Sequence, residues 1–176
     1  ERYVNLVAQA FEDALKEEIL RTTGPGTLAE SYIKKIGEIP GSTGLLVGLR
    51  VGDSLYLIRL GDGGFIALDQ AGQPIYMDGK IADKNSPIEI GPKSPPVGLK
   101  DLTIKKIPFK RGARIFAFSD GFLKGQSTTP FEVSKRIQEL VRRRRSTVDI
   151  TITLLEEASG TNKKFKDDSS LVGFEA

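Results

Sequence analysis

The chain has 176 residues, enough for one domain with a buried core, and its net charge of +3 is too small to indicate nucleic-acid binding. It contains no Cys and no His, which excludes disulfides, Cys-ligated zinc, a thiolate nucleophile and a histidine base. No apolar run approaches the ~20 residues of a membrane span and no signal peptide is visible, so we expect a cytoplasmic protein without a membrane partner.

Two amphipathic helices are predicted at the start of the chain. Over residues 3–20, apolar residues recur at helical spacing, with Glu and Lys between them. A Gly-Pro-Gly break at 24–26 separates this segment from a second helix over about 27–38. Thr27 is the candidate N-cap of that helix, and Glu30 is its capping-box partner.

From Ser42 the pattern changes to one typical of strands. Tight turns are predicted at 51–53 and 61–63, where Gly and Asp interrupt apolar runs. Residues 78–100 carry four prolines and predict an irregular connection, which is either a substrate-recognition flap or a plain crossover. The predicted strands are 43–50, 54–60, 64–69, a short one around 75–77, 102–108, 113–119 and 169–175.

Two further helices are predicted before the last strand. Thr129 to Glu132 form a capping box with Pro at the first helical position, which predicts a helix to about Arg145. The four arginines 142–145 end this helix, where its dipole favours cations, and no aromatic platform accompanies them, so nucleic acid is not expected. Residues 146–158 fit a strand or a helix, and we predict a helix. The order of elements predicts an α+β layered domain.

The run 113–118 is the most apolar and aromatic strand, and it ends at Ser119, Asp120 and Gly121. Such a run predicts a strand buried on both faces, which would hold Asp120 rigidly at the rim of a sheet. Gly121 would let the chain turn at once and let another group approach. This arrangement suits an oxygen ligand of a metal ion, although an isolated Asp-Gly is more often a plain turn.

Three acidic sites share this pattern of an apolar strand beside an Asp in a tight turn, namely 60–64, 118–121 and 166–170. If their strands are neighbours, the carboxylates converge. Two carboxylates about 4 Å apart repel by roughly 4 kcal/mol at an effective dielectric of about 20, so the cluster would need a cation. Oxygen ligands in a chain without His or Cys indicate Mg²⁺ or Mn²⁺.

Four motifs resemble, in order and rough spacing, those of the metal-dependent type 2C protein phosphatases, the PPM family. They are Gly41–Gly44, Leu60–Gly63, Phe118–Phe122 and Asp167–Val172. Ser94–Leu99 followed by Phe109–Arg114 is similar to the SpoIIE-like bacterial branch. The resemblance covers about residues 1–175. It implies a four-layer αββα sandwich of two antiparallel sheets, with the first two helices over one face and those after residue 129 over the other.

The resemblance also implies a site and a reaction. Asp120 and Asp167 match ligands of a two-metal centre, and Asp62 matches the ligand of a third, weaker metal. The supporting residues would be Gly61, Gly121 and Asp168, with Asp168 capping its turn. The implied function is hydrolysis of phosphoserine or phosphothreonine in a protein substrate, in bacterial signalling. Water activated by Mn²⁺ or Mg²⁺ would attack, with no catalytic side chain and no covalent intermediate.

One family feature is absent from this sequence. Family members carry an earlier acidic strand and an Asp-Gly motif with the metal-bridging carboxylate, but residues 1–40 contain no such pattern, and Glu12 and Asp13 lie within a predicted helix. Two interpretations stay open. Either the domain is N-terminally incomplete in this sequence, or the chain is an inactive pseudophosphatase that binds a ligand or a partner as a regulatory domain. Retention of all three aspartates favours the enzyme.

Overall fold

The computed structural model describes residues 45–80, 103–126, 128–159 and 170–176. The predicted helices 3–20 and 27–38 and the Pro-rich connection from residue 81 onward lie outside these ranges. The chain forms two compact units, and the single domain predicted from the sequence stays a prediction. The described parts of the first unit are 45–49, 56–61 and 103–105, and those of the second are 50–55, 62–80, 106–126, 128–159 and 170–176.

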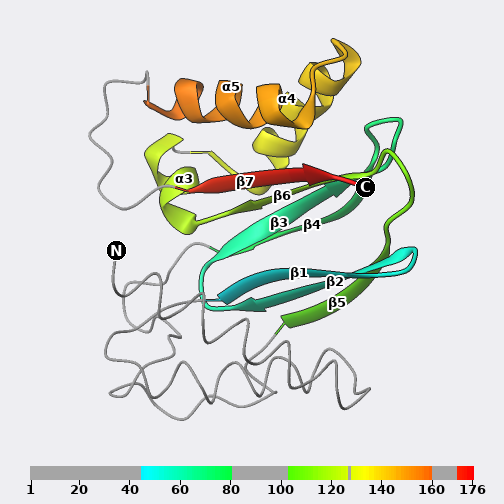
Figure 1. Ribbon diagram of the computed structural model, residues 1–176. Coiled ribbons are helices and arrows are strands. Elements are labelled where there is room, and N and C mark those ends of the chain that lie inside the picture. Colours follow the sequence, from blue (N-terminus) through cyan, green and yellow to red (C-terminus); the bar gives the residue numbers. More distant parts are fainter. Residues whose placement is uncertain (1–44, 81–102, 127, 160–169) are drawn as a thin grey trace, which may run out of the picture. The chain divides into compact units, whose positions relative to one another are not determined.

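The described residues form an α+β fold with two antiparallel sheets, as predicted (Figure 1). The strands are β1 Leu45–Val51, β2 Ser54–Leu60, β3 Gly63–Leu68, β4 Pro74–Lys80, β5 Thr103–Pro108, β6 Arg114–Phe118 and β7 Leu171–Glu175. The helices are α3 Asp120–Gln126, α4 Pro130–Arg142 and α5 Thr147–Ser159. One sheet has the strand order β1-β2-β5, and the other has the order β4-β3-β6-β7. The bounds of β2 are those predicted, and β1, β3, β6 and β7 differ from prediction by one or two residues at one or both ends. The predicted starts of β1 and β5 lie outside the described residues.

The four-stranded sheet is organised around the β3–β6 pair. These strands are antiparallel, with Gly64 opposite Phe118 and Leu68 opposite Arg114. β7 pairs with the other side of β6, so the strand that ends at Asp120 and the strand that follows the 166–170 site are neighbours, as convergence of the carboxylates requires. β4 is longer than the predicted 75–77 because it pairs along the whole of β3. It begins at Pro74, at an edge of the sheet, where proline's missing N–H is tolerated.

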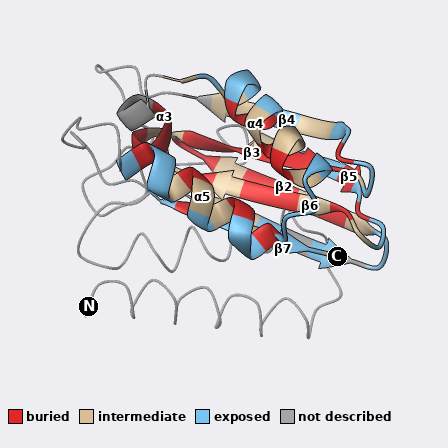
Figure 2. Ribbon diagram, turned by 90° about the horizontal axis from the view of Figure 1, so that it is seen from above, coloured by how far each residue is buried: buried red, intermediate tan, exposed pale blue. Residues whose placement is uncertain are grey.

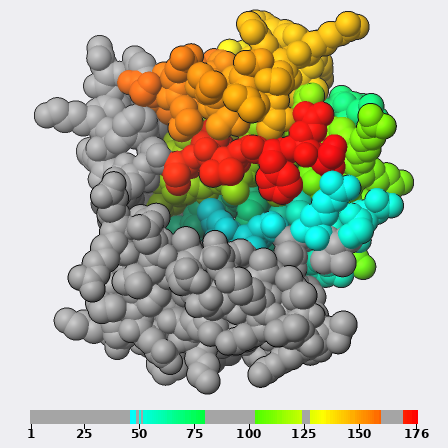
Figure 3. Space-filling view, in the orientation of Figure 1, coloured from blue at the N-terminus to red at the C-terminus, as the bar shows by residue number. Residues whose placement is uncertain are grey.

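Helices α4 and α5 cover one face of this sheet (Figure 1). Their apolar residues pack against those of the strands in one core cluster. α5 lies against β7, which is visible as a red band beneath it in Figure 3. Gly173 allows this close packing, because a Cβ there would lie 2.6 Å from the Thr151 hydroxyl. The main core residues on this face are Ile66, Leu68, Phe116, Phe118, Ile137, Ile150 and Leu154.

The opposite face of the sheet is buried along β3 and at Ile115 of β6, whereas Val172 and Phe174 of β7 are exposed. β3 is buried along its whole length (Figure 2), including Phe65 and Ala67, which point away from the helices, and Ile115 of β6 is buried with them. The predicted burial of the 113–118 strand on both faces is therefore confirmed in its main features. The second helical layer of the predicted αββα sandwich lies outside the described residues.

The two helices predicted after residue 129 are confirmed in type and corrected in extent. α4 starts with the predicted capping box: the Thr129 N–H donates to the Glu132 carboxylate at 2.8 Å, and the Glu132 N–H donates to the Thr129 hydroxyl at 3.3 Å. It ends at Arg142, three residues before the predicted end, because Arg144 has a left-handed φ of 57°. The ambiguous segment after it is the helix α5. None of the described helices is long and apolar enough to cross a membrane.

Candidate metal centre

Asp120 stands at the end of β6, as the first residue of α3. The sequence predicted a turn here, and this is wrong: the chain continues directly into a helix, and Gly121 lies within it and is buried. The physical reason is that Phe122 and Leu123 follow, and both are fully buried in the core. The Asp120 carboxylate, which is half-buried, occupies a first helical turn, where the helix dipole favours negative charge.

Asp62 lies in the tight turn between β2 and β3, as predicted. The glycines on either side, Gly61 and Gly63, have φ angles of 81° and 92°, which glycine adopts without steric penalty. The Arg59 guanidinium donates to the Gly61 carbonyl at 2.8 Å and holds the start of the turn. The turn therefore presents the half-buried Asp62 at the beginning of β3.

The register of β3 and β6 brings these two aspartates to the same end of the sheet. Gly64 pairs with Phe118, and Asp62 precedes Gly64 by two residues while Asp120 follows Phe118 by two. The two residues are 58 positions apart in the sequence. Two of the three predicted ligands, Asp62 and Asp120, thus lie at the same end of the sheet, as a shared metal site requires.

Ser119 joins the start of β7 to this edge. Its hydroxyl accepts a hydrogen bond from the Ser170 N–H at 2.9 Å, and its own N–H donates to the Ser170 carbonyl at 3.1 Å. Asp167 and Asp168, which lie outside the described residues, precede Ser170 by three and two positions. Sequence reasoning missed this role of Ser119, for which the hydroxyl beside the aspartate was the only signal.

The residues at this edge fit a hard divalent cation in kind. Asp62 and Asp120 offer carboxylate oxygens, which are the ligands that Mg²⁺ and Mn²⁺ prefer. Within the described ranges, no three acidic side chains form a metal-binding group by themselves. A centre with three acidic ligands at this end of the sheet would therefore need a ligand from outside the described ranges, and the sequence predicts Asp167 for that role.

No family model and no curated protein matches the chain. Solved structures do match. The photosystem II phosphatase PBCP has a TM-score of 0.68 at 19% identity, covering 95% of this chain and 63% of PBCP. The phosphatase domain of SpoIIE from Bacillus subtilis has a TM-score of 0.55 at 13% identity, covering 99% of this chain and 73% of that one. The serine threonine phosphatase PstP, in complex with two manganese ions, has a TM-score of 0.60 at 16% identity, covering 96% and 79%.

The chain has a PP2C-like fold. At these identities the likeness establishes the fold, and it agrees with the family resemblance carried by the sequence motifs. The chain spans 63% of the length of PBCP. Asp62 and Asp120 lie where the two central strands of the four-stranded sheet meet at one end: Asp62 just before β3 begins, and Asp120 just after β6 ends.

Proposed function

We propose that the protein is a Mn²⁺- or Mg²⁺-dependent phosphatase that hydrolyses phosphoserine or phosphothreonine in a protein substrate. The observation that carries this proposal is the meeting of Asp62, Asp120 and the start of β7 at one end of a PP2C-like sheet. In this proposal, Asp62, Asp120 and Asp167, from three segments that are distant in the sequence, would supply the oxygen ligands. The manganese ions in the structure of PstP, a phosphatase of the same fold, support the choice of metal.

The proposed roles follow the positions of the residues. Asp120 and Asp167 would hold a two-metal centre, and Asp62 would hold a third, weaker ion. Gly61 would set the turn of Asp62, and Ser119 would fasten β7 beside Asp120. When bound, the cations would activate water for in-line attack on phosphorus and neutralise charge on the phosphoryl oxygens. The rigid end of β6 would keep the Asp120 carboxylate in place during turnover.

Hydrolysis of p-nitrophenyl phosphate and of a phosphothreonine peptide tests the proposal. In a protein that also carries the metal-bridging carboxylate, which residues 1–40 lack, we expect turnover with Mn²⁺ or Mg²⁺ and none with EDTA. For the 176 residues alone we expect weak turnover or none, because one cation would be poorly held. Asp120→Asn should lower the rate at least about 100-fold, because even residues that only support a metal ligand contribute 10–100-fold. Asp53→Asn, the same change in the exposed β1–β2 turn, should leave the rate unchanged.

Two outcomes would count against this assignment. Turnover that persists in EDTA would refute the metal-dependent mechanism, and full activity of Asp120→Asn would refute the ligand assignment. Mn²⁺ binding without hydrolysis of either substrate would instead favour the alternative, an inactive pseudophosphatase that acts as a regulatory binding domain.

A further inference from the structure

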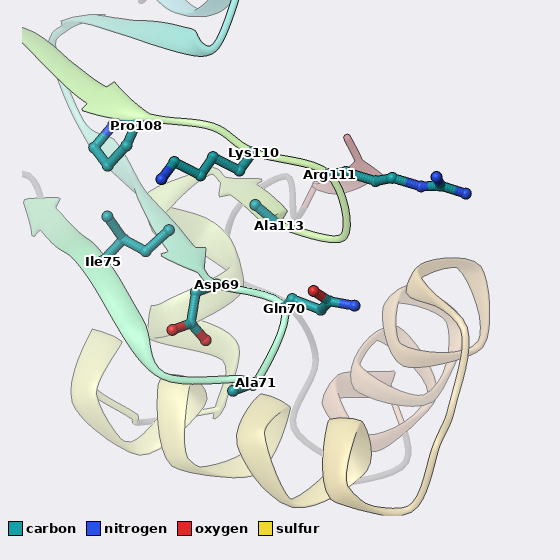
Figure 4. A pocket seen from close by; sticks show the side chains of 8 residues that line it. All are labelled: Asp69, Gln70, Ala71, Ile75, Pro108, Lys110, Arg111 and Ala113. Carbon is teal, nitrogen blue, oxygen red and sulfur yellow. The ribbon is translucent and has the colours of Figure 1, made fainter.

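A cavity of about 550 Å³ lies at the opposite end of the four-stranded sheet from Asp62 and Asp120 (Figure 4). It opens between the β3–β4 turn and the connection from β5 to β6. β3 and β6 run antiparallel, so the end of β3 lies beside the start of β6 there. The volume is within the range of about 300–1,000 Å³ that small-molecule sites occupy. The cavity shares no residue with the proposed metal centre.

Each of the two connections that form the cavity walls is held by hydrogen bonds between its own residues. In the β3–β4 turn, the Gln73 N–H donates to the Asp69 carboxylate at 2.7 Å, and the Asp69 N–H donates to the Gln73 carbonyl at 2.9 Å. In the opposite wall, the Ala113 N–H donates to the Lys110 carbonyl at 2.9 Å. The cavity is therefore preformed, and the Asp69 carboxylate already accepts a hydrogen bond from the turn that it begins.

The cavity combines apolar walls with a cation. Its walls include Ala71, Ile75, Pro108 and Ala113. Figure 4 shows the Lys110 side chain extending across the cavity toward Pro108 and Ile75. Over the part of the chain that the structure describes, the Lys110 ammonium has neither an ion pair nor a hydrogen bond. The Lys110 ammonium is therefore available to bind an anionic group in the cavity.

Lys110 is the cation that extends into the cavity. Arg111, the next residue, also lines it, but its side chain extends away from the cavity in Figure 4. Asp69 is the one acidic side chain that lines the cavity, and its carboxylate is bonded to the turn. The Lys110 ammonium is therefore the charged group in the cavity that is left to bind an anionic ligand.

We propose that this cavity binds a small organic anion, independently of the metal centre. The apolar body of the ligand would lie against Ile75 and Pro108. Its carboxylate, sulfonate or phosphate head would accept a charge-assisted hydrogen bond from Lys110. Gln70 also lines the cavity and could donate a second hydrogen bond to the head.

Two fluorescent probes that differ by one group test this proposal. 8-Anilinonaphthalene-1-sulfonate carries an aromatic body and an anionic head, and N-phenyl-1-naphthylamine is the same body without the sulfonate. We expect Lys110→Met to raise the dissociation constant of the sulfonate about 10-fold and to leave that of the neutral probe within about 2-fold. Lys135→Met, an identical change at an exposed position of α4 outside the cavity, should alter neither constant.

Methyl chemical shifts locate the bound probe. The methyl groups of Ala71, Ile75 and Ala113 should shift when the sulfonate is added to the parent chain, because they line the cavity. An unchanged dissociation constant in Lys110→Met, shifts confined to methyl groups elsewhere, or no binding of the sulfonate below about 1 mM would each overturn the proposal. These experiments measure probe binding and not phosphatase activity. A failed cavity proposal can therefore be told apart from a failed metal-centre proposal.

Discussion

At Gly64 the backbones of β3 and β4 pass too close together for a side chain. A Cβ on Gly64 would lie 2.1 Å from the carbonyl oxygen of Asp78, which belongs to the backbone of β4. Relief would require one strand to move away from the other, close to the edge that carries Asp62. We expect Gly64→Ala to lower the free energy of unfolding by about 1–3 kcal/mol, as other overpacked positions do, measured by urea denaturation.

Gly52 provides the matched control at the residue scale. Gly52 lies in the tight β1–β2 turn, but no atom lies within 4 Å of the position that a Cβ would take there. Its left-handed φ of 59° is one that Asn tolerates, so Gly52→Asn should change the free energy of unfolding by less than about 1 kcal/mol. Equal losses in the two variants would contradict the steric explanation for Gly64.

At the scale of the elements, Glu175 joins β7 to both β6 and α5. Its carboxylate accepts from the Arg114 guanidinium at 3.0 Å and from the Thr147 hydroxyl at 2.9 Å. The hydrogen bond from Arg114, more than that from Thr147, holds the pKa of Glu175 below its ordinary value of 4.5, although partial burial opposes this. A lowered folded-state pKa stabilises the fold above about pH 4.5, and this stability is lost as the pH falls through the folded-state pKa.

Glu175→Gln should therefore lower the urea midpoint at pH 7, and the difference from the parent should shrink toward about pH 3. The effect should be modest, because the side chain is 42% exposed and solvent screens the pair. Glu156→Gln, at an exposed position of α5, should follow the parent at every pH. A difference that persists unchanged in acid would show that the ionised Glu175 is not responsible.

For the whole molecule, the proposed metal centre links cation binding to folding. Only the folded chain brings Asp62, Asp120 and the start of β7 together, so Mn²⁺ should stabilise the folded form alone. At 100 times the dissociation constant, the gain is about 2.7 kcal/mol. For a chain of this size we expect the melting temperature to rise by about 5–10 °C.

Asp120→Asn should abolish this rise in melting temperature, whereas Asp53→Asn should retain it. Differential scanning fluorimetry over a Mn²⁺ titration measures both variants beside the parent. If Asp120→Asn responds to Mn²⁺ as the parent does, Asp120 is not a metal ligand.

Local features were predictable from the sequence because neighbouring residues determine them. The capping box of Thr129 and Glu132 needs only four consecutive residues, and the glycines around Asp62 need only the turn they form. β2 was predicted with its observed bounds because its apolar run is flanked by turn residues. The aspartates at 62 and 120 were singled out by the same local pattern of an apolar strand followed by Asp and Gly.

The tertiary structure alone decided where these local features meet. The helix α3 replaces the predicted turn because the core accepts Phe122 and Leu123, and that space is supplied by distant residues. Ser119 accepts a hydrogen bond from Ser170, 51 positions later in the chain. Lys110 and Ile75 line one cavity only because the β5–β6 connection lies beside the start of β4 in the folded chain. Propensity and periodicity act over a few residues, whereas strand pairing and burial depend on segments that contact one another only after the chain has folded.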